Sequence, residues 1–184
     1  MAQRYLISQD SPALYITVVT KDRLPVFQKH LLKEILCQAI DEARKRFLLF
    51  AYVIMIDHLH LLTSKPTTTS EVLRVLKGLT ARRVIDYLSE NNHPSSLAKL
   101  RHRERDRNYK YSLWQREKNV LPIFSEAMFM EKLNYIHQNP VRANLVNRAI
   151  DYRWSSARIW QGCPMENEPL QMDKDLIYWR VQPR

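Results

Sequence analysis

The stretch Leu48–Lys65, LLFAYVIMIDHLHLLTSK, decides the fold of this chain. Its first eight residues are apolar and rich in strand formers, which predicts a buried strand. Ile56-Asp57 predicts a tight turn into a second, antiparallel strand. Because side chains alternate along a strand, we expect His58 and His60 to point the same way, with Leu59 in the core. The stretch therefore predicts a hairpin that presents two imidazoles side by side.

The flanking sequence extends this hairpin into an alternation of strands and helices. The further predicted elements are a strand over 14–20, a helix over 29–47, a helix over 71–90 capped by Ser70, a strand within 111–124 and a helix over 126–138. The order β-α-β-β-α-β predicts an α+β fold, the ferredoxin-like arrangement with an antiparallel sheet and added C-terminal helices. The sequence shows no internal repeat, so we expect residues 1–184 to form a single domain.

Composition indicates the kind of partner. The 184 residues include 29 Lys or Arg and 19 Asp or Glu, a net charge of +10. This balance favours a polyanion, with nucleic acid ahead of a membrane surface. We find no apolar run of about 18 residues, which predicts no transmembrane helix, and no signal peptide core. Cys37 and Cys163 are too few for a disulfide framework, which favours a cytoplasmic setting.

The helix over 126–138 carries a second pair of polar residues. Tyr135 and Asn139 are four residues apart, so they face the same place on a helix. A proline restricts the residue before it, so Pro140 is expected to end the helix at Asn139. Asn139 would then have the freedom of a helix terminus to reach a metal ion.

Three blocks of sequence resemble the single-tyrosine HUH transposases, and in particular the REP-associated tyrosine transposase branch. They are MIDHLHLL at 55–62, YIHQNPVRANLV at 135–146 and DYRWSSA at 151–157. The resemblance runs in the same order from about residue 14 to 160. The two histidines alone are a weak signal, whereas the tyrosine block with the Trp-Ser-Ser-Ala block downstream is specific.

The resemblance implies a role for each of four residues. His58 and His60 would be metal ligands, Tyr135 the nucleophile and Asn139 the third ligand. The implied activity is that of a metal-dependent DNA strand transferase, which cleaves and rejoins single-stranded or hairpin DNA through a 5′-phosphotyrosine. Two imidazoles and one amide leave room in an octahedral shell for substrate oxygens, which suits Mg²⁺ or Mn²⁺, whereas zinc usually takes more protein ligands.

The chain departs from the family pattern at two places. Ile56-Asp57 stands where the family usually has Pro-Asn, and Asn144 where it usually has Gly. If the second position needs a positive φ, Asn is the best-tolerated substitute. Asp57 is expected to point away from His58, to the opposite face of the strand.

Basic residues concentrate between Lys99 and Lys118, which include eight Lys or Arg and three Asp or Glu. Aromatic residues are interleaved, a pattern typical of contact with phosphates and unpaired bases. The candidate DNA-binding residues here are Arg101, Arg103, Arg105, Arg107, Lys110 and Trp114, and a second cluster consists of Lys77, Arg82 and Arg83. The alternative for the first group is a solvated loop.

Several alternatives stay open at the level of sequence. The chain could be a DNA-binding regulator of repeated hairpins that has kept the fold without the activity. A replication or conjugation initiator is less favoured, because the histidine pair precedes the tyrosine. The resemblance allows a monomer or a homodimer. His137 is interpreted as structural or adjacent to substrate, and Tyr152, Trp154 and Trp160 as packing residues.

Overall fold

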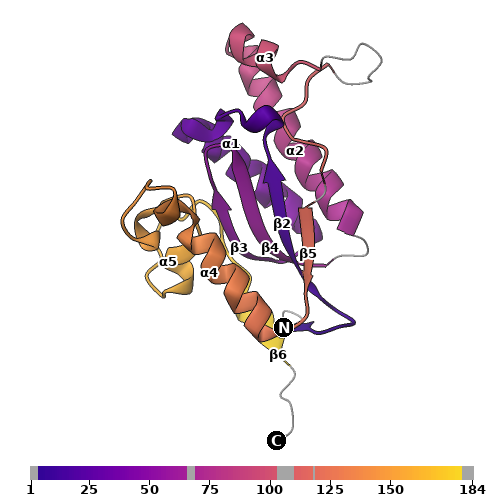
Figure 1. The fold of residues 1–184 in the computed structure, drawn as a ribbon, viewed down its shortest axis with the longest axis vertical. Coiled ribbons are helices and arrows are strands. Elements are labelled where there is room, and N and C mark those ends of the chain that lie inside the picture. The colour runs from indigo at the N-terminus through magenta and orange to yellow at the C-terminus, as the bar shows by residue number, and fades with distance from the viewer. Residues whose placement is uncertain (1–3, 66–68, 103–109, 118, 180–184) are drawn as a thin grey trace, which may run out of the picture.

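The computed structural model describes residues 4–65, 69–102, 110–117 and 119–179. Its main sheet has four antiparallel strands (Figure 1): β2 (Ala13–Val19), β3 (Leu49–Ile54), β4 (His58–Ser64) and β5 (Asn119–Ile123). They are arranged in the order β3-β4-β2-β5. The first and third strands of the β-α-β-β-α-β unit are therefore central, which confirms the predicted ferredoxin-like fold.

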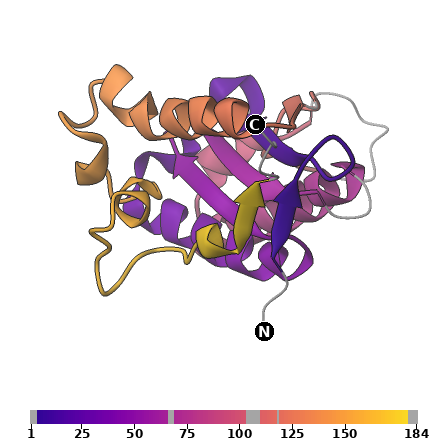
Figure 2. The ribbon, with the colours of Figure 1, turned by 90° about the horizontal axis from the view of Figure 1, so that it is seen from below.

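Helices cover both faces of this sheet. α1 (His30–Ala43) and α2 (Thr69–Glu90) pack against each other on one face. α4 (Glu126–Arg142) crosses the other face and packs on β3 and β4, as Figures 1 and 2 show. β3 is fully buried along its length, because helices lie on both of its sides. The sheet thus separates an α1–α2 layer from an α4 layer.

Some predicted boundaries differ from the observed ones. α2 begins at Thr69, so Ser70 lies inside the helix and the predicted cap is wrong. The predicted strand within 111–124 is shorter, and its early part instead makes isolated bridges, of which Thr20–Trp114 is one. A short helix that we did not predict, α3 (Pro94–Leu100), follows α2 and has its proline in the first turn, where a proline is tolerated.

The C-terminal segment returns to the start of the chain. After the short helix α5 (Ala157–Trp160), strand β6 (Ile177–Trp179) pairs in parallel with β1 (Tyr5–Ile7). The two strands lie together beneath α4 in the view of Figure 2. Within the described residues, no helix is long and apolar enough to cross a membrane.

The end of α4 corrects one prediction and confirms another. The helix continues through Pro140 to Arg142, so Pro140 does not end it at Asn139. Leu145 N donates to Pro140 O (2.9 Å) and Asn144 N to Val141 O (2.9 Å), which is a Schellman motif. Asn144 has φ of +54°, so this position does require the left-handed conformation that asparagine tolerates.

Candidate active site

The two histidines of β4 lie together on the α4 side of the sheet. The ring centroids of His58 and His60 are 4.9 Å apart, and the rings are nearly perpendicular. Leu59 between them is completely buried in the core. The alternation expected from the sequence is therefore observed.

His60 is fixed by two hydroxyl groups from the neighbouring strand. Thr17 lies directly opposite it in the register of β2 and β4, with Oγ1 at 2.8 Å from Nδ1. Tyr15 Oη is 2.9 Å from the same nitrogen. Burial, followed by the charge of His58, lowers the pKa of His60 to about 3. The ring is therefore neutral near pH 7, and its Nε2 is the nitrogen left for a further ligand.

His58 is fixed by a carboxylate. Its Nδ1 donates to Asp57 Oδ1 at 2.6 Å, and Asp57 Oδ2 accepts from Arg23 Nη1 at 3.0 Å. Burial alone raises the pKa of Asp57, but the hydrogen bonds and charges of His58 and Arg23 outweigh it and the net shift is downward. This contact holds the imidazole in the tautomer whose Nε2 lone pair is free to bind a metal.

The position of Asp57 corrects the expectation that it points away from His58. That expectation assumed strand alternation, but β4 begins at His58 and Asp57 belongs to the preceding bend. A residue in a bend does not follow the alternation of a strand. The sequence signal for this contact is therefore only that the two residues are adjacent.

Tyr135 extends from α4 toward the histidine pair. Three buried residues one turn or less apart, Phe129, Leu133 and Ile136, hold this helix on the sheet. The Tyr135 ring lies edge-on to His60, with 5.6 Å between centroids, and the side chain is 39% exposed. The structure thus brings the predicted nucleophile together with the two histidines among the predicted ligands, at a place open to solvent.

Two cations flank the aromatic rings of this site. The guanidinium carbon of Arg142 lies 5.1 Å from the centre of the Tyr135 ring, and Lys132 Nζ lies 6.0 Å from that of Tyr15. Lys132, Tyr135 and Arg142 are three and seven residues apart, so they share one side of α4. This spacing was the available signal for Arg142, which the sequence analysis did not single out. Lys132 is paired with Glu131 at 2.7 Å, so Arg142 is the main positive charge beside the tyrosine.

Asn139 lies one turn beyond Tyr135 inside the helix, and not at its terminus as predicted. Its Nδ2 donates to Tyr135 O at 2.7 Å, so the amide oxygen is the atom left for a cation. Among the described residues, no group of three His, Cys, Asp or Glu could hold a metal ion. The predicted donor set would consist of two imidazole nitrogens and one amide oxygen. Such a set fits a cation that also takes oxygens from substrate or water.

The block at 151–157 is a packing element, as predicted for its aromatic residues. Tyr152 and Trp154 are buried, and Tyr152 Oη donates to Ile54 O at 2.7 Å. Ser156 is also buried, and its Oγ lies 3.0 Å from His137 Nε2. His137 is therefore a structural residue, which ties the helix of Tyr135 to this block.

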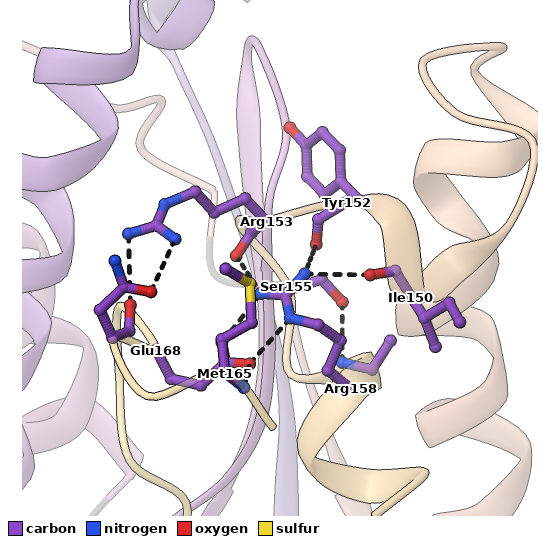
Figure 3. A network of polar contacts seen from close by, with 9 residues as sticks. Ile150, Tyr152, Arg153, Ser155, Arg158, Met165 and Glu168 are labelled. Atoms are coloured by element: carbon purple, nitrogen blue, oxygen red, sulfur yellow. Dashed lines mark hydrogen bonds and ion pairs between the residues drawn. The ribbon is translucent and has the colours of Figure 1, made fainter. Parts of the chain in front are cut away.

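A buried arginine that the sequence analysis did not single out organises this block (Figure 3). Arg158 donates to the carbonyls of Ile150 (3.0 Å), Tyr152 (3.2 Å) and Arg153 (3.0 Å). It also makes a two-point ion pair with Glu168, at 2.8 Å for each contact. The side chains of this pair are 8% and 1% exposed. Such a bidentate pair fixes the segment geometrically, and with it the contact between Ser156 and His137.

Trp114 does not have the environment predicted for a base-stacking residue. It is 5% exposed, its ring stacks on Phe27 and its Nε1 donates to Thr80 Oγ1 at 2.8 Å. Its faces are thus occupied within the core. The interleaving of tryptophan with basic residues misled the prediction, because spacing alone does not show which way a loop side chain points.

The other candidate DNA-binding residues lie away from Tyr135 or outside the described residues. Lys77 donates to the carbonyls of Gln115 and Glu117, Arg83 pairs with Glu42, and Arg82 lies near Asp86 (3.7 Å). All three belong to α2, on the face of the sheet opposite α4 (Figure 1). Arg101 and Lys110 are exposed, whereas Arg103, Arg105 and Arg107 lie outside the described residues.

A comparison with known protein families identifies this arrangement. The family described as "Transposase IS200 like" matches residues 10–139, which include β2, the histidine pair of β4, Tyr135 and Asn139. The chain belongs to this family, and it is a transposase-like protein of the DNA-processing kind. The comparison with curated proteins found no match.

Two solved structures are similar to this chain, and the first of them supports the fold. The structure of a REP-associated tyrosine transposase bound to a REP hairpin is 18% identical in sequence, with a TM-score of 0.60, and covers 95% of this chain and 92% of that one. A Deinococcus radiodurans R1 protein, described as a candidate transposase, is 22% identical with a TM-score of 0.45, over 70% of this chain and 90% of that one. The first likeness confirms the expected fold of the REP-associated branch.

Proposed function

We propose that this protein is a metal-dependent DNA strand transferase that cleaves and rejoins single-stranded or hairpin DNA through Tyr135. The observation that supports this most is the contact of the Tyr135 ring with His60, which itself lies beside His58. Two histidines, each held through Nδ1, and an exposed phenol suit a phosphodiester and a cation.

The proposed ligands are Nε2 of His58, Nε2 of His60 and the amide oxygen of Asn139, and the proposed ion is Mg²⁺ or Mn²⁺. When bound, such an ion polarises the scissile phosphate and neutralises the charge that develops on its oxygens. The two imidazoles are held in position through their Nδ1 atoms. Asp57 contacts His58, and the hydroxyls of Tyr15 and Thr17 contact His60.

Tyr135 is proposed as the nucleophile. Its Oη forms a bond to phosphorus while the bond from phosphorus to the 3′-oxygen breaks, and the proton lost by the phenol balances the one gained by the 3′-oxygen. The product is a 5′-phosphotyrosine with a free 3′-hydroxyl. A second 3′-hydroxyl can reverse the step, because the link keeps the energy of the original diester. Arg142, beside the Tyr135 ring, is placed to attract the phosphate.

The proposed substrate is DNA with an unpaired stretch next to a hairpin. A protein of the same fold has been solved with a REP hairpin bound, which supports a hairpin as part of the substrate. Because Tyr135 and both histidines of one chain lie together, we propose that a monomer completes the site.

The test is the formation of a covalent protein–DNA adduct. The protein is incubated with Mn²⁺ and a pool of hairpin oligonucleotides with randomised single-stranded flanks, then run on a denaturing gel. We expect an adduct that EDTA, His58→Ala and His60→Ala each suppress, whereas the control His93→Ala, in another part of the fold, retains it. An adduct that forms at an unchanged rate in EDTA contradicts the metal role. Tight hairpin binding without any adduct supports a regulator instead.

A further inference from the structure

Gly78, in the middle of α2, has no explanation within the chain itself. Glycine is less favourable than alanine inside a helix, and such a position normally has a reason in conformation or packing. Gly78 has neither a positive φ nor a close neighbour that would exclude a side chain. Gly162 is the only glycine with a positive φ among the described residues, and a Cβ built on Gly78 meets no atom within 4 Å. The missing side chain thus leaves open space on the outer surface of the helix.

The surroundings of Gly78 are strongly basic. Arg74, Gly78 and Arg82 are exposed and four residues apart, so they form one stripe, which we call the α2 ridge. A hollow of about 830 Å³ lies on one side of the ridge, toward α1, and another of about 660 Å³ on the other side, toward 110–116. Seven Lys or Arg line these hollows: Lys45, Arg46, Arg74, Lys77, Arg82, Lys110 and Arg116.

The charge of this surface is only partly neutralised locally, by an ion pair of Arg46 with Glu71 (3.2 Å), which lies outside the lining of both hollows. Only two acidic residues, Glu42 and Asp86, line the same hollows. Glu42 already pairs with Arg83, and Asp86 lies 3.7 Å from Arg82, whose side chain is 80% exposed. Within the described residues, no ion pair is made by Lys45 or Arg74. The ridge therefore fits a polyanion, and like charges disfavour a second copy of the same face.

We propose that the α2 ridge binds the sugar-phosphate backbone of double-stranded DNA, with Gly78 at the point of closest approach. Unpaired bases are bound by exposed aromatic faces. The described large apolar side chains that are exposed all lie elsewhere: Leu31, Ile56, Leu121, Met130, Tyr135, Leu145, Met165 and Tyr178. Tyr111 lines the second hollow, but it is partly buried and Lys110 Nζ lies over its ring at 5.3 Å. Cations with no fully exposed aromatic ring beside them favour contact with phosphates, and we take a duplex as the partner.

The dimensions of the ridge agree with this partner. Arg74 and Arg82 are eight residues apart, about 12 Å along the helix axis. The major groove of B-DNA is also about 12 Å wide. The two arginines can therefore reach phosphates on both sides of one groove, while the helix backbone at Gly78 faces the groove between them. A side chain at this position would hold the helix away from the DNA.

The test separates helix stability from DNA binding at a single position. Binding is measured by fluorescence anisotropy with a labelled blunt duplex of two helical turns, about 20 base pairs. Gly78→Ala should raise Tm by about 2–4 °C, because alanine favours the helix and the space is open. It should nevertheless weaken duplex binding. Gly78→Gln should weaken binding further, by about tenfold or more.

Two controls accompany these variants. Ser89→Gln adds the same side chain to an exposed position of α2 outside both hollows, and should leave the affinity unchanged. The affinity should fall with salt less steeply in Arg74→Ala. The slope of log affinity against log salt should be smaller in magnitude by about 0.9, the effect of one duplex phosphate contact. Unchanged duplex affinity in Gly78→Gln overturns the proposal. So does an oligothymidine strand that binds as tightly as the duplex and responds equally to Gly78→Gln.

This inference rests on the proposed function only in taking DNA as the partner. The experiments can contradict the duplex-binding ridge and the proposed active site independently of each other. The α2 ridge belongs to the helix on the face of the sheet opposite α4, the helix that carries Tyr135 (Figure 1). Adduct formation that persists while Gly78→Gln leaves duplex binding unchanged overturns the ridge and retains the active site. Duplex binding that depends on Gly78, without an adduct in any condition, supports the ridge and removes the proposed chemistry.

Discussion

Asp57 accepts a hydrogen bond of 2.6 Å from Nδ1 of the next residue, His58, and joins it to Arg23 on another loop. Arg23 has a positive φ of +51°, as does the preceding Asp22 (+52°), which is uncommon for a residue with a side chain. Adjacent residues in a strand would point apart, so the contact exists only because the bend ends between them. It prepares one proposed ligand before any cation arrives.

The first prediction concerns this carboxylate. Asp57→Asn keeps the size of the side chain but removes the charge that supports the imidazole, and we expect Mn²⁺ affinity to fall by about 10- to 100-fold. Isothermal titration with Mn²⁺ measures this without any DNA. Asp22→Asn is the control, since that carboxylate is 63% exposed and, among the described residues, pairs with Lys21 alone. Equal Mn²⁺ affinity in Asp57→Asn and wild type rules out a positioning role for Asp57.

A second prediction follows from the buried His137. Burial lowers its pKa to about 4, from an ordinary value of 6.5. As the pH falls, His137 is therefore protonated in the unfolded chain before it is protonated in the folded one. The stability that the neutral ring contributes is fully present only above about pH 6.5. It is lost as the pH falls toward 4.

Replacement of this histidine should remove that dependence. From about pH 7 to about pH 5, the free energy of unfolding should fall in both proteins. The fall should be about 2 kcal/mol smaller in His137→Gln than in wild type. Urea unfolding at both pH values gives the comparison. His60, whose pKa is also lowered, keeps its own contribution in both proteins. An identical loss in the two proteins contradicts a neutral, buried His137.

A third prediction is that Trp114 stabilises the fold, and does not stack on bases as expected from the sequence. Because this ring stacks on Phe27 and its Nε1 donates to Thr80, Trp114→Ala should destabilise the fold by about 3–5 kcal/mol. Trp114→Phe keeps an aromatic ring and should cost less. Thermal unfolding measures both variants. Wild-type Tm in Trp114→Ala together with weaker binding to single strands restores the base-stacking interpretation.

Much of the fold was predictable because its signals are local. The alternation around His58 and His60 predicted their shared side, and the four-residue spacing of Tyr135 and Asn139 predicted theirs. The positive φ of Asn144 followed from the usual presence of glycine there. In each case, neighbours in sequence determine the geometry.

The residues missed by sequence reasoning depend on contacts between distant segments. Thr17 reaches His60 only because of the register of β2 and β4, which sequence alone does not specify. The pairing of β1 with β6 joins the two ends of the chain through three residues each. The continuation of α4 past Pro140 depends on the cap at Asn144, whose hydrogen bonds outweigh the one that proline removes.

Two tyrosines, Tyr15 and Tyr135, lie beside the histidine pair, and either could in principle supply the nucleophilic hydroxyl. Tyr15 Oη contacts His60 at 2.9 Å, and the Tyr15 and Tyr135 rings are 6.3 Å apart. Burial, the largest influence, raises the pKa of Tyr15 to about 12, and its hydroxyl is already engaged by His60. Tyr135 is 39% exposed on the α4 side of the site. We therefore propose Tyr135 as the nucleophile.

Peptide mapping of the covalent adduct tests this assignment most directly. Trypsin should release LNYIHQNPVR, residues 133–142, which contains a single tyrosine. After nuclease treatment, mass spectrometry should find a nucleotide phosphate on Tyr135, and Tyr135→Phe should form no adduct while it still binds DNA. Tyr15→Phe should retain the adduct. A nucleotide on Tyr15, or an adduct at wild-type level in Tyr135→Phe, would contradict the account.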